Sequence, residues 1–219
     1  MPIFVINFKL YEEILGEKGR KIAEAAKRIA SRSGVNIVIA PPAADIRLLS
    51  GIMPVVAQHI DPVESGAQTG HITAESVKAA GAIGTLINHS EKPMDIGDVE
   101  KCVLRAKQNK LITICCADSP ENAALFAKLD PDYVLIEPPE LIGGKNSVSK
   151  TKPEVISSAV GLVRSANPNV GLICGAGVST SEDAAIAKKL GAVGVAAASA
   201  IAKSANPERV IEEISNGLI

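Results

Sequence analysis

Ionisable and polar side chains follow three of the apolar runs in this sequence, at the point where each run ends. Asn7 and Lys9 end the first run, His89 and Glu91 follow a second, and Glu137 ends a third. Carboxylate, imidazole and ammonium groups are the side chains that transfer protons or stabilise developing negative charge. These three run ends are therefore the candidate sites of chemistry.

Two further run ends are rich in glycine and other small residues. Residues 174–179 read Cys-Gly-Ala-Gly-Val-Ser, and residues 196–201 read Ala-Ala-Ala-Ser-Ala-Ile. Small residues let a phosphate approach the backbone amides closely, and a helix N-terminus attracts its charge. Glycine-rich turns are common in α/β proteins, so this pattern indicates a phosphate site only in combination with the three polar run ends.

Eight short apolar runs predict β-strands, and several are continuously apolar, which is typical of parallel strands covered on both faces. A helical segment follows each run, which predicts a parallel sheet with crossover helices. The predicted strands are Ile3–Asn7, Asn36–Ala40, Val55–Gln58, Thr85–Asn88, Leu111–Cys115, Tyr133–Glu137, Val170–Cys174 and Val193–Ala197.

The helices are predicted from apolar periodicity and from start and stop signals. They include Arg20–Arg32, Asp98–Asn109, a helix capped by Ser119, a helix from Lys152 through Ser165, and a helix capped by Thr180 or Ser181. Eight β/α units on a short chain of class α/β favour a closed (β/α)8 barrel, with residues 1–219 as one domain. The rival is an open doubly wound sheet, and the strand ends must decide, because barrels build their sites there.

Three strand-end motifs carry a resemblance to a known family. In order they are Asn7–Lys9, Asn88–Glu91 and Glu137–Gly144. Together they resemble triosephosphate isomerase over essentially the whole chain, and the short chain with few aromatics is similar to the archaeal members. The resemblance implies a TIM barrel that interconverts dihydroxyacetone phosphate and D-glyceraldehyde 3-phosphate through an enediolate. It implies no cofactor and a place in glycolysis and gluconeogenesis.

The resemblance also implies roles for single residues. Glu137 is the proton acceptor, and His89 is the electrophile that polarises the substrate carbonyl. Lys9 stabilises negative charge, Asn7 helps to orient the site, and Glu91 holds Lys9 in place. Phosphate contacts are implied for Ile142, Gly143, Gly177, Ala198 and Ser199, with a closing lid from Pro138 to about Ser147.

His89 has a further expected property that follows from the residues. Ser90 can cap a helix directly after it, which would place His89 beside a helix N-terminus. The positive end of that helix favours a neutral imidazole, which can donate a hydrogen bond to a carbonyl.

The segment Gly66–His71 resembles the family loop that docks into a neighbouring subunit, with Thr69 at the interface, so a homo-oligomer is implied. The other interpretation is an exposed glycine-rich loop. His59 and His71 are expected at an interface or in solvent. Two separated histidines without a nearby cysteine make a poor metal site, so no metal is expected.

Several positions depart from the common bacterial and eukaryotic pattern. Lys92 and Pro93 replace two arginines, and Glu140 replaces a lid tryptophan. Gly177 occupies the position of a serine, and Ala198 and Ser199 occupy the positions of two glycines. Main-chain phosphate contacts tolerate these changes, whereas the kinetics of the lid depend on them.

Two other functions remain open from the residues. One is another phosphate-binding barrel enzyme, such as an epimerase, synthase or lyase acting on a sugar phosphate. The other is a non-enzymatic triose-phosphate sensor or assembly subunit. The first alternative shares the small-residue loops but does not require Asn7, Lys9, His89 and Glu137 together. Loss of the base or the electrophile would favour the second, and both residues are present.

Composition and charge narrow the partners and the compartment. The 23 basic and 24 acidic residues give a net charge of −1, and aromatics are scarce. Such a surface favours neither nucleic acid nor an anionic membrane. No apolar run reaches the ~18 residues of a membrane span. The N-terminus has no signal-peptide pattern, and four cysteines form no disulfide framework, so a reduced cytoplasmic protein is expected.

Overall fold

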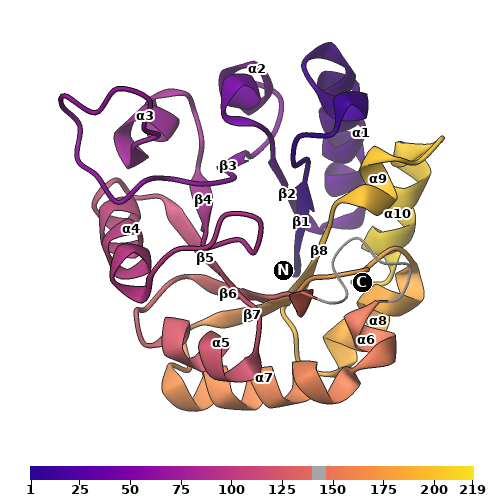
Figure 1. Cartoon of the computed structure of the whole chain (residues 1–219). Coiled ribbons are helices and arrows are strands. Elements are labelled where there is room, and N and C mark those ends of the chain that lie inside the picture. The colour runs from indigo at the N-terminus through magenta and orange to yellow at the C-terminus, as the bar shows by residue number, and fades with distance from the viewer. Residues whose placement is uncertain (140–146) are drawn as a thin grey trace.

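The computed structural model describes residues 1–139 and 147–219 of the chain (Figure 1). Within these residues eight strands are present, at positions close to the eight predicted runs. They are β1 (Ile3–Asn7), β2 (Asn36–Ala40), β3 (Val56–Ala57), β4 (Gly84–Ile87), β5 (Ile112–Ala117), β6 (Tyr133–Ile136), β7 (Gly171–Cys174) and β8 (Gly194–Ala197).

All strand pairs are parallel, and the strands follow the order β2-β1-β8-β7-β6-β5-β4-β3. A parallel bridge between Ile39 and Val55 joins the two ends of this order, next to β2 and β3. The sheet therefore closes on itself. The predicted (β/α)8 barrel is confirmed, and the open doubly wound sheet is excluded.

The helices lie around the outside of the strands, from α1 and α2 at the top of Figure 1 through α4 on the left to α7 at the bottom. Their bounds are η1 (Glu12–Ile14), α1 (Glu17–Ser33), η2 (Ala43–Asp45), α2 (Ile46–Ser50), α3 (Ala74–Ala79), α4 (Ile96–Gln108), α5 (Pro120–Ala127), α6 (Val148–Thr151), α7 (Pro153–Ala166), α8 (Ser181–Lys189), α9 (Ser199–Ala202) and α10 (Pro207–Asn216). The predicted caps are confirmed, since Ser119 and Thr180 each accept the backbone N–H three residues on.

The buried side chains form two groups, because successive residues of a strand point to opposite faces. One group fills the barrel interior and consists mainly of branched aliphatic residues such as Val5, Leu86 and Ile114. The larger group lies between the strands and the surrounding helices. Cys115 belongs to the outer group and Cys116 to the inner one.

None of the helices in the described parts of the chain is long and apolar enough to cross a membrane.

Candidate active site

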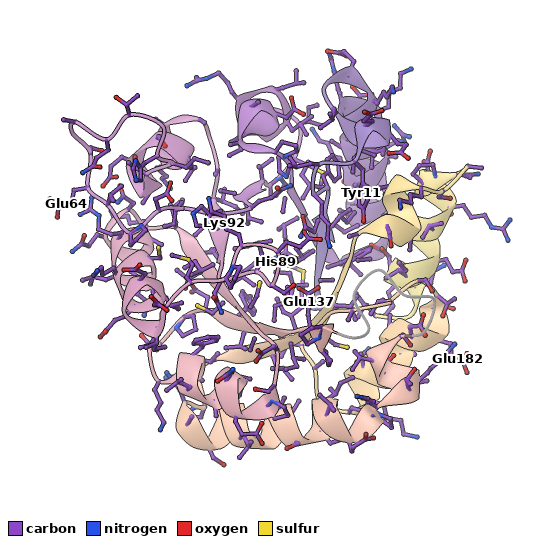
Figure 2. All side chains as sticks on the ribbon, in the orientation of Figure 1. Tyr11, Glu64, His89, Lys92, Glu137 and Glu182 are labelled. Atoms are coloured by element: carbon purple, nitrogen blue, oxygen red, sulfur yellow. The ribbon has the colours of Figure 1, made fainter. Side chains whose placement is uncertain are left out.

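Glu137 and His89 face each other at the carboxyl ends of β6 and β4, and Figure 2 shows the two labelled side chains next to each other. The distance from His89 Nε2 to Glu137 Oε2 is 3.2 Å, with 7% and 14% of the side chains exposed. The two atoms do not meet hydrogen-bond geometry, and among the described residues neither has another hydrogen-bond partner. Both polar atoms therefore have unused hydrogen-bonding capacity.

The tautomer of His89 follows from its other ring nitrogen. The backbone N–H of Glu91 donates to Nδ1 of His89 over 3.2 Å. Nδ1 is therefore the acceptor, and in the neutral ring the proton is assigned to Nε2. This assignment directs an N–H donor toward the side of the ring where Glu137 lies.

The expected helix beside His89 is absent from this part of the described chain. α4 begins at Ile96 and its N-cap residue is Asp95, so the prediction that Ser90 caps a helix is wrong. Residues 90–95 form a turn instead, in which the Lys92 N–H donates to the His89 carbonyl over 2.7 Å. Pro93 explains why α4 starts later than predicted, because a proline disfavours helical backbone in the residue before it.

A backbone hydrogen bond and the space beside a glycine set the position of Glu137. Its N–H donates to the Ala117 carbonyl over 2.9 Å. Gly175 lies directly against it: a Cβ at that position would lie 2.5 Å from Glu137 Cγ and 2.7 Å from Oε1. Only glycine leaves room for the carboxylate as it lies here. From the sequence, Gly175 was predicted only as part of a phosphate loop.

A tight turn after β1 places Lys9. Its φ is 47°, a left-handed value that is uncommon outside glycine. The Lys9 N–H donates to Asn7 Oδ1 over 2.9 Å. The side-chain amide of Gln58 donates to the carbonyls of Lys9 and Ala40, each over 2.9 Å, and so ties this turn to the end of β2.

The ammonium group of Lys9 is paired with a carboxylate, as the resemblance implied. Lys9 Nζ lies 2.7 Å from Glu91 Oε1, with 13% of the Lys9 side chain exposed. Asn88 fixes the end of β4, since its amide donates to the Cys116 carbonyl and accepts the Met94 N–H. The φ of Asn88 is 62°, which is left-handed as well. The strand pattern in the sequence did not reveal that Asn88 fixes this turn.

A cavity of about 430 Å³ brings three of the four catalytic candidates together with the small-residue loops. Asn7, Lys9 and Glu137 line it with the predicted phosphate residues Gly177, Ala198 and Ser199. A second cavity, also of about 430 Å³, is lined by Asn7, Lys9, Tyr11, His59, His89 and Glu91 among others. The predicted contacts Ile142 and Gly143 and most of the predicted lid lie outside the described residues. Thr69 is exposed in loop 59–72 and does not line either cavity.

Two residues at the main cavity were not singled out from the sequence. Lys203, just after α9, lies with its Nζ 5.1 Å from the centre of the Tyr11 ring, and both line the cavity. Figure 2 shows Tyr11 beside the end of the chain that carries α9. A lysine over an aromatic face is attracted by the ring quadrupole, and its charge also favours an anionic ligand in the cavity.

His59 lines the second cavity and pairs with a nearby acid. Its Nε2 lies 3.0 Å from Asp61 Oδ1. Burial lowers the pKa of His59 below its ordinary value, although the hydrogen bond to Asp61 opposes this effect. In the described parts of the chain, no group of three or more His, Cys, Asp and Glu side chains is arranged to hold a metal ion.

The barrel, with its proton-transfer groups gathered where the strands end, defines the class: this is a (β/α)8-barrel enzyme. The family model of triosephosphate isomerase matches residues 2–214. The chain belongs to the triosephosphate isomerase family, and it is an isomerase.

Relatives from archaea support this membership along the length of the chain. The triosephosphate isomerase of Methanothermus fervidus is 43% identical over 215 residues, which cover 97% of each chain. Those of Methanocaldococcus jannaschii and Sulfurisphaera tokodaii are 44% and 45% identical, covering 97% of this chain and 98% and 93% of theirs. The resemblance drawn from the three strand-end motifs is confirmed.

Proposed function

We propose that this chain interconverts dihydroxyacetone phosphate and D-glyceraldehyde 3-phosphate with Glu137 as base and His89 as electrophile. The observation that carries the assignment is the approach of Glu137 Oε2 to His89 Nε2, at 3.2 Å, beside a cavity that also holds Lys9 and the small-residue loops. A carboxylate and a hydrogen-bond donor this close together can act on neighbouring atoms of one small substrate.

Glu137 removes the proton from the carbon next to the substrate carbonyl. The electron pair of the broken C–H bond forms the carbon–carbon double bond of the enediolate. As that double bond forms, the carbonyl π pair moves onto the carbonyl oxygen. The protonated carboxyl group then returns the proton to the neighbouring carbon, and the hydroxyl proton passes from one substrate oxygen to the other, so that the carbonyl and hydroxyl groups exchange places. Positioned general bases contribute roughly 10²–10⁴-fold. Gly175 and the Ala117 carbonyl support this function by fixing where the carboxylate lies.

His89 and Lys9 stabilise the negative charge that develops on the substrate oxygens. The Nε2–H of His89 donates to the carbonyl oxygen, because Nδ1 is already occupied by the Glu91 N–H. The ammonium group of Lys9 adds a full positive charge, and Glu91 holds it in place at 2.7 Å. Donors that are oriented before the reaction are the largest contribution to such catalysis in many enzymes.

The substrate phosphate binds at the loops after β7 and β8. Gly177, Ala198 and Ser199 line the same cavity as Glu137, and phosphate groups often bind at this place in barrels. Ile142 and Gly143, proposed from the resemblance alone, would add contacts. Lys203 lies at the same cavity and adds positive charge near the dianion.

The assignment of the base is tested by shortening its side chain. Glu137→Asp keeps the charge but retracts the carboxylate by about 1 Å or slightly more, a misplacement that can cost on the order of 10²-fold. In a coupled assay with D-glyceraldehyde 3-phosphate, kcat should fall by that factor while KM changes little. Glu100→Asp, on the exposed surface of α4, is the control. If both substitutions had equal small effects on kcat, Glu137 would not be the base.

We further propose that the chain forms a homo-oligomer through loop 59–72. Its base is closed by two 2.7 Å contacts between Asp61 and Ile72, while residues 64–71 are exposed. Charged substitutions at Gln68 and Thr69 should raise the monomer fraction in sedimentation and lower activity together. A monomeric wild-type protein with full activity would refute the proposal.

The compartment we propose is the cytoplasm. The four cysteines all lie in the described residues and are all free and buried. Unpaired cysteines fit a reducing compartment. Finding the native protein in a secreted fraction would contradict this assignment.

A further inference from the structure

Asp183 is a buried carboxylate outside the catalytic cluster, at the start of α8. Only 2% of the residue is exposed. A buried charge is costly unless donors satisfy it, so its partners indicate what it stabilises.

Both oxygens of Asp183 accept several hydrogen bonds. Oδ2 accepts the backbone N–H groups of Ser179 and Thr180, each over 3.0 Å. Oδ1 accepts the Ser147 hydroxyl over 2.6 Å and lies 3.3 Å from Lys150 Nζ. Burial acts to raise the pKa of Asp183, but the hydrogen bonds from Ser147, Ser179 and Thr180 outweigh it and lower the pKa below its ordinary value.

These partners belong to two different segments. Ser179 ends the turn that includes Ala176 and Gly177 and lines the main cavity. Ser147 begins the segment that leads into α6, and the Val148 N–H donates to the Ala176 carbonyl over 3.1 Å. Ala176 and Gly177 have left-handed φ values of 66° and 74°, so the turn adopts a conformation that needs support from its surroundings.

Helix capping accounts for only part of this arrangement. Thr180 and Asp183 form a capping box at the start of α8. The contacts to Ser147 and to the N–H of Ser179 extend beyond the helix and reach the cavity turn. Capping alone would not require the second segment.

We infer that Asp183 is a positioning residue that holds the turn 176–179 in the geometry that binds the substrate phosphate. The inference rests on the proposed function, because that function assigns the phosphate to this turn. Asp183 does not contact the substrate and acts through the backbone of Ser179 and through Ser147.

The test is Asp183→Asn, which keeps the shape of the side chain. In either orientation the new NH2 group faces existing donors, either the two backbone N–H groups or the Lys150 ammonium. Glu182→Gln is the matched control, because it removes the same charge at the preceding residue. The Glu182 side chain is 71% exposed and also pairs with Lys150. Figure 2 shows Glu182 at the outer edge of the molecule.

Three measurements separate positioning from general damage. For Asp183→Asn, kcat/KM with D-glyceraldehyde 3-phosphate should fall about tenfold, mainly through KM, the loss expected for one charge-assisted hydrogen bond. The Kd for inorganic phosphate, measured by calorimetry, should rise by a similar factor. Turnover of D-glyceraldehyde, which lacks the phosphate, should change little. Glu182→Gln should leave all three near wild type.

Equal losses with the phosphorylated and unphosphorylated substrates would overturn the inference, as would an unchanged or tighter Kd for inorganic phosphate. If Asp183→Asn does not fold, Ser147→Ala removes a single contact and should shift the phosphate Kd in the same direction by a smaller factor. A wild type that binds phosphate but does not isomerise triose phosphates would refute the proposed function alone, because the phosphate Kd still tests Asp183.

Discussion

Gly175→Ala tests the position of the carboxylate of Glu137, the proposed base, without changing any charged group. The added Cβ would lie 2.5 Å from Glu137 Cγ, whereas ordinary contacts begin at 3.4 Å, so the side chain must move by about 0.9 Å (3.4 minus 2.5). A misplacement of about 1 Å can cost on the order of 10²-fold in rate. We therefore expect kcat to fall by roughly 10²-fold, with KM changed only a few-fold.

The assay is the coupled isomerase reaction, with circular dichroism melts to compare stability. Gly161→Ala is the control, because a Cβ there meets nothing within 4 Å and the residue lies on the exposed face of α7. Alanine in a helix is favoured over glycine by about 0.5–1 kcal/mol, so this variant should be slightly more stable and fully active.

A double mutant shows whether the two positions act on each other. With Glu137→Ala in place, the Cγ and carboxylate that the new Cβ would meet are gone, so adding Gly175→Ala should cost far less of the residual activity than it does in the wild type. If Gly175→Ala alone retains wild-type kcat, the carboxylate does not react from the place where the structure has it, and the reasoning fails.

Four other outcomes are expected. His89→Gln should lower kcat by about 10²-fold with a smaller effect on inhibition by inorganic phosphate; equal losses would contradict an electrophilic role. Lys203→Met should raise KM and weaken the salt dependence of kcat/KM; an unchanged salt slope would count against a charge effect. Asp183→Asn should lower the free energy of unfolding by about 2 kcal/mol at pH 7. Because the pKa of Asp183 is lowered on folding, this difference should persist above about pH 4 and vanish as the pH falls through the folded-state value, which urea titrations at several pH values check. Burial raises the pKa of the thiols of Cys102 and Cys115 to about 12, so these two should resist thiol reagents at pH 8 until the protein unfolds; rapid labelling of the native protein would show otherwise.

The strands and the barrel were predictable because their signal is local. Continuous apolar runs such as Asn36–Ala40 reflect burial on both faces, and β1 and β2 begin and end at the predicted residues. β3 is shorter than predicted, Val56–Ala57 rather than Val55–Gln58. The Gln58 side chain there bonds to carbonyls of the neighbouring segments, which an apolar pattern cannot reveal.

Contacts between distant segments were not predictable from one sequence. Three contacts join parts of the chain that are far apart in sequence and meet only in the folded protein. They are the space that Gly175 leaves for Glu137, the contact of Asp183 with Ser147, and the approach of Lys203 to Tyr11. The helix start after His89 was placed wrongly because Ser90 and Asp95 are both ordinary capping residues. Pro93 was the local signal that favours the later start.

The amide of Gln58 has a consequence for chemical ageing. Its single NH2 group donates to the carbonyls of both Lys9 and Ala40. Hydrolysis to a carboxylate would replace this donor with an acceptor. The Lys9 carbonyl would lose its side-chain partner, the Ala40 carbonyl would keep only the N–H of Phe8, and both oxygens would face a negative charge. Glutamine is among the thermolabile residues. Loss of one ammonia molecule would thus weaken the attachment of the Lys9 turn to β2, where the bond from the Phe8 N–H to the Ala40 carbonyl remains. We expect activity to fall on prolonged heating before the barrel unfolds, since Lys9 is proposed to act on the substrate.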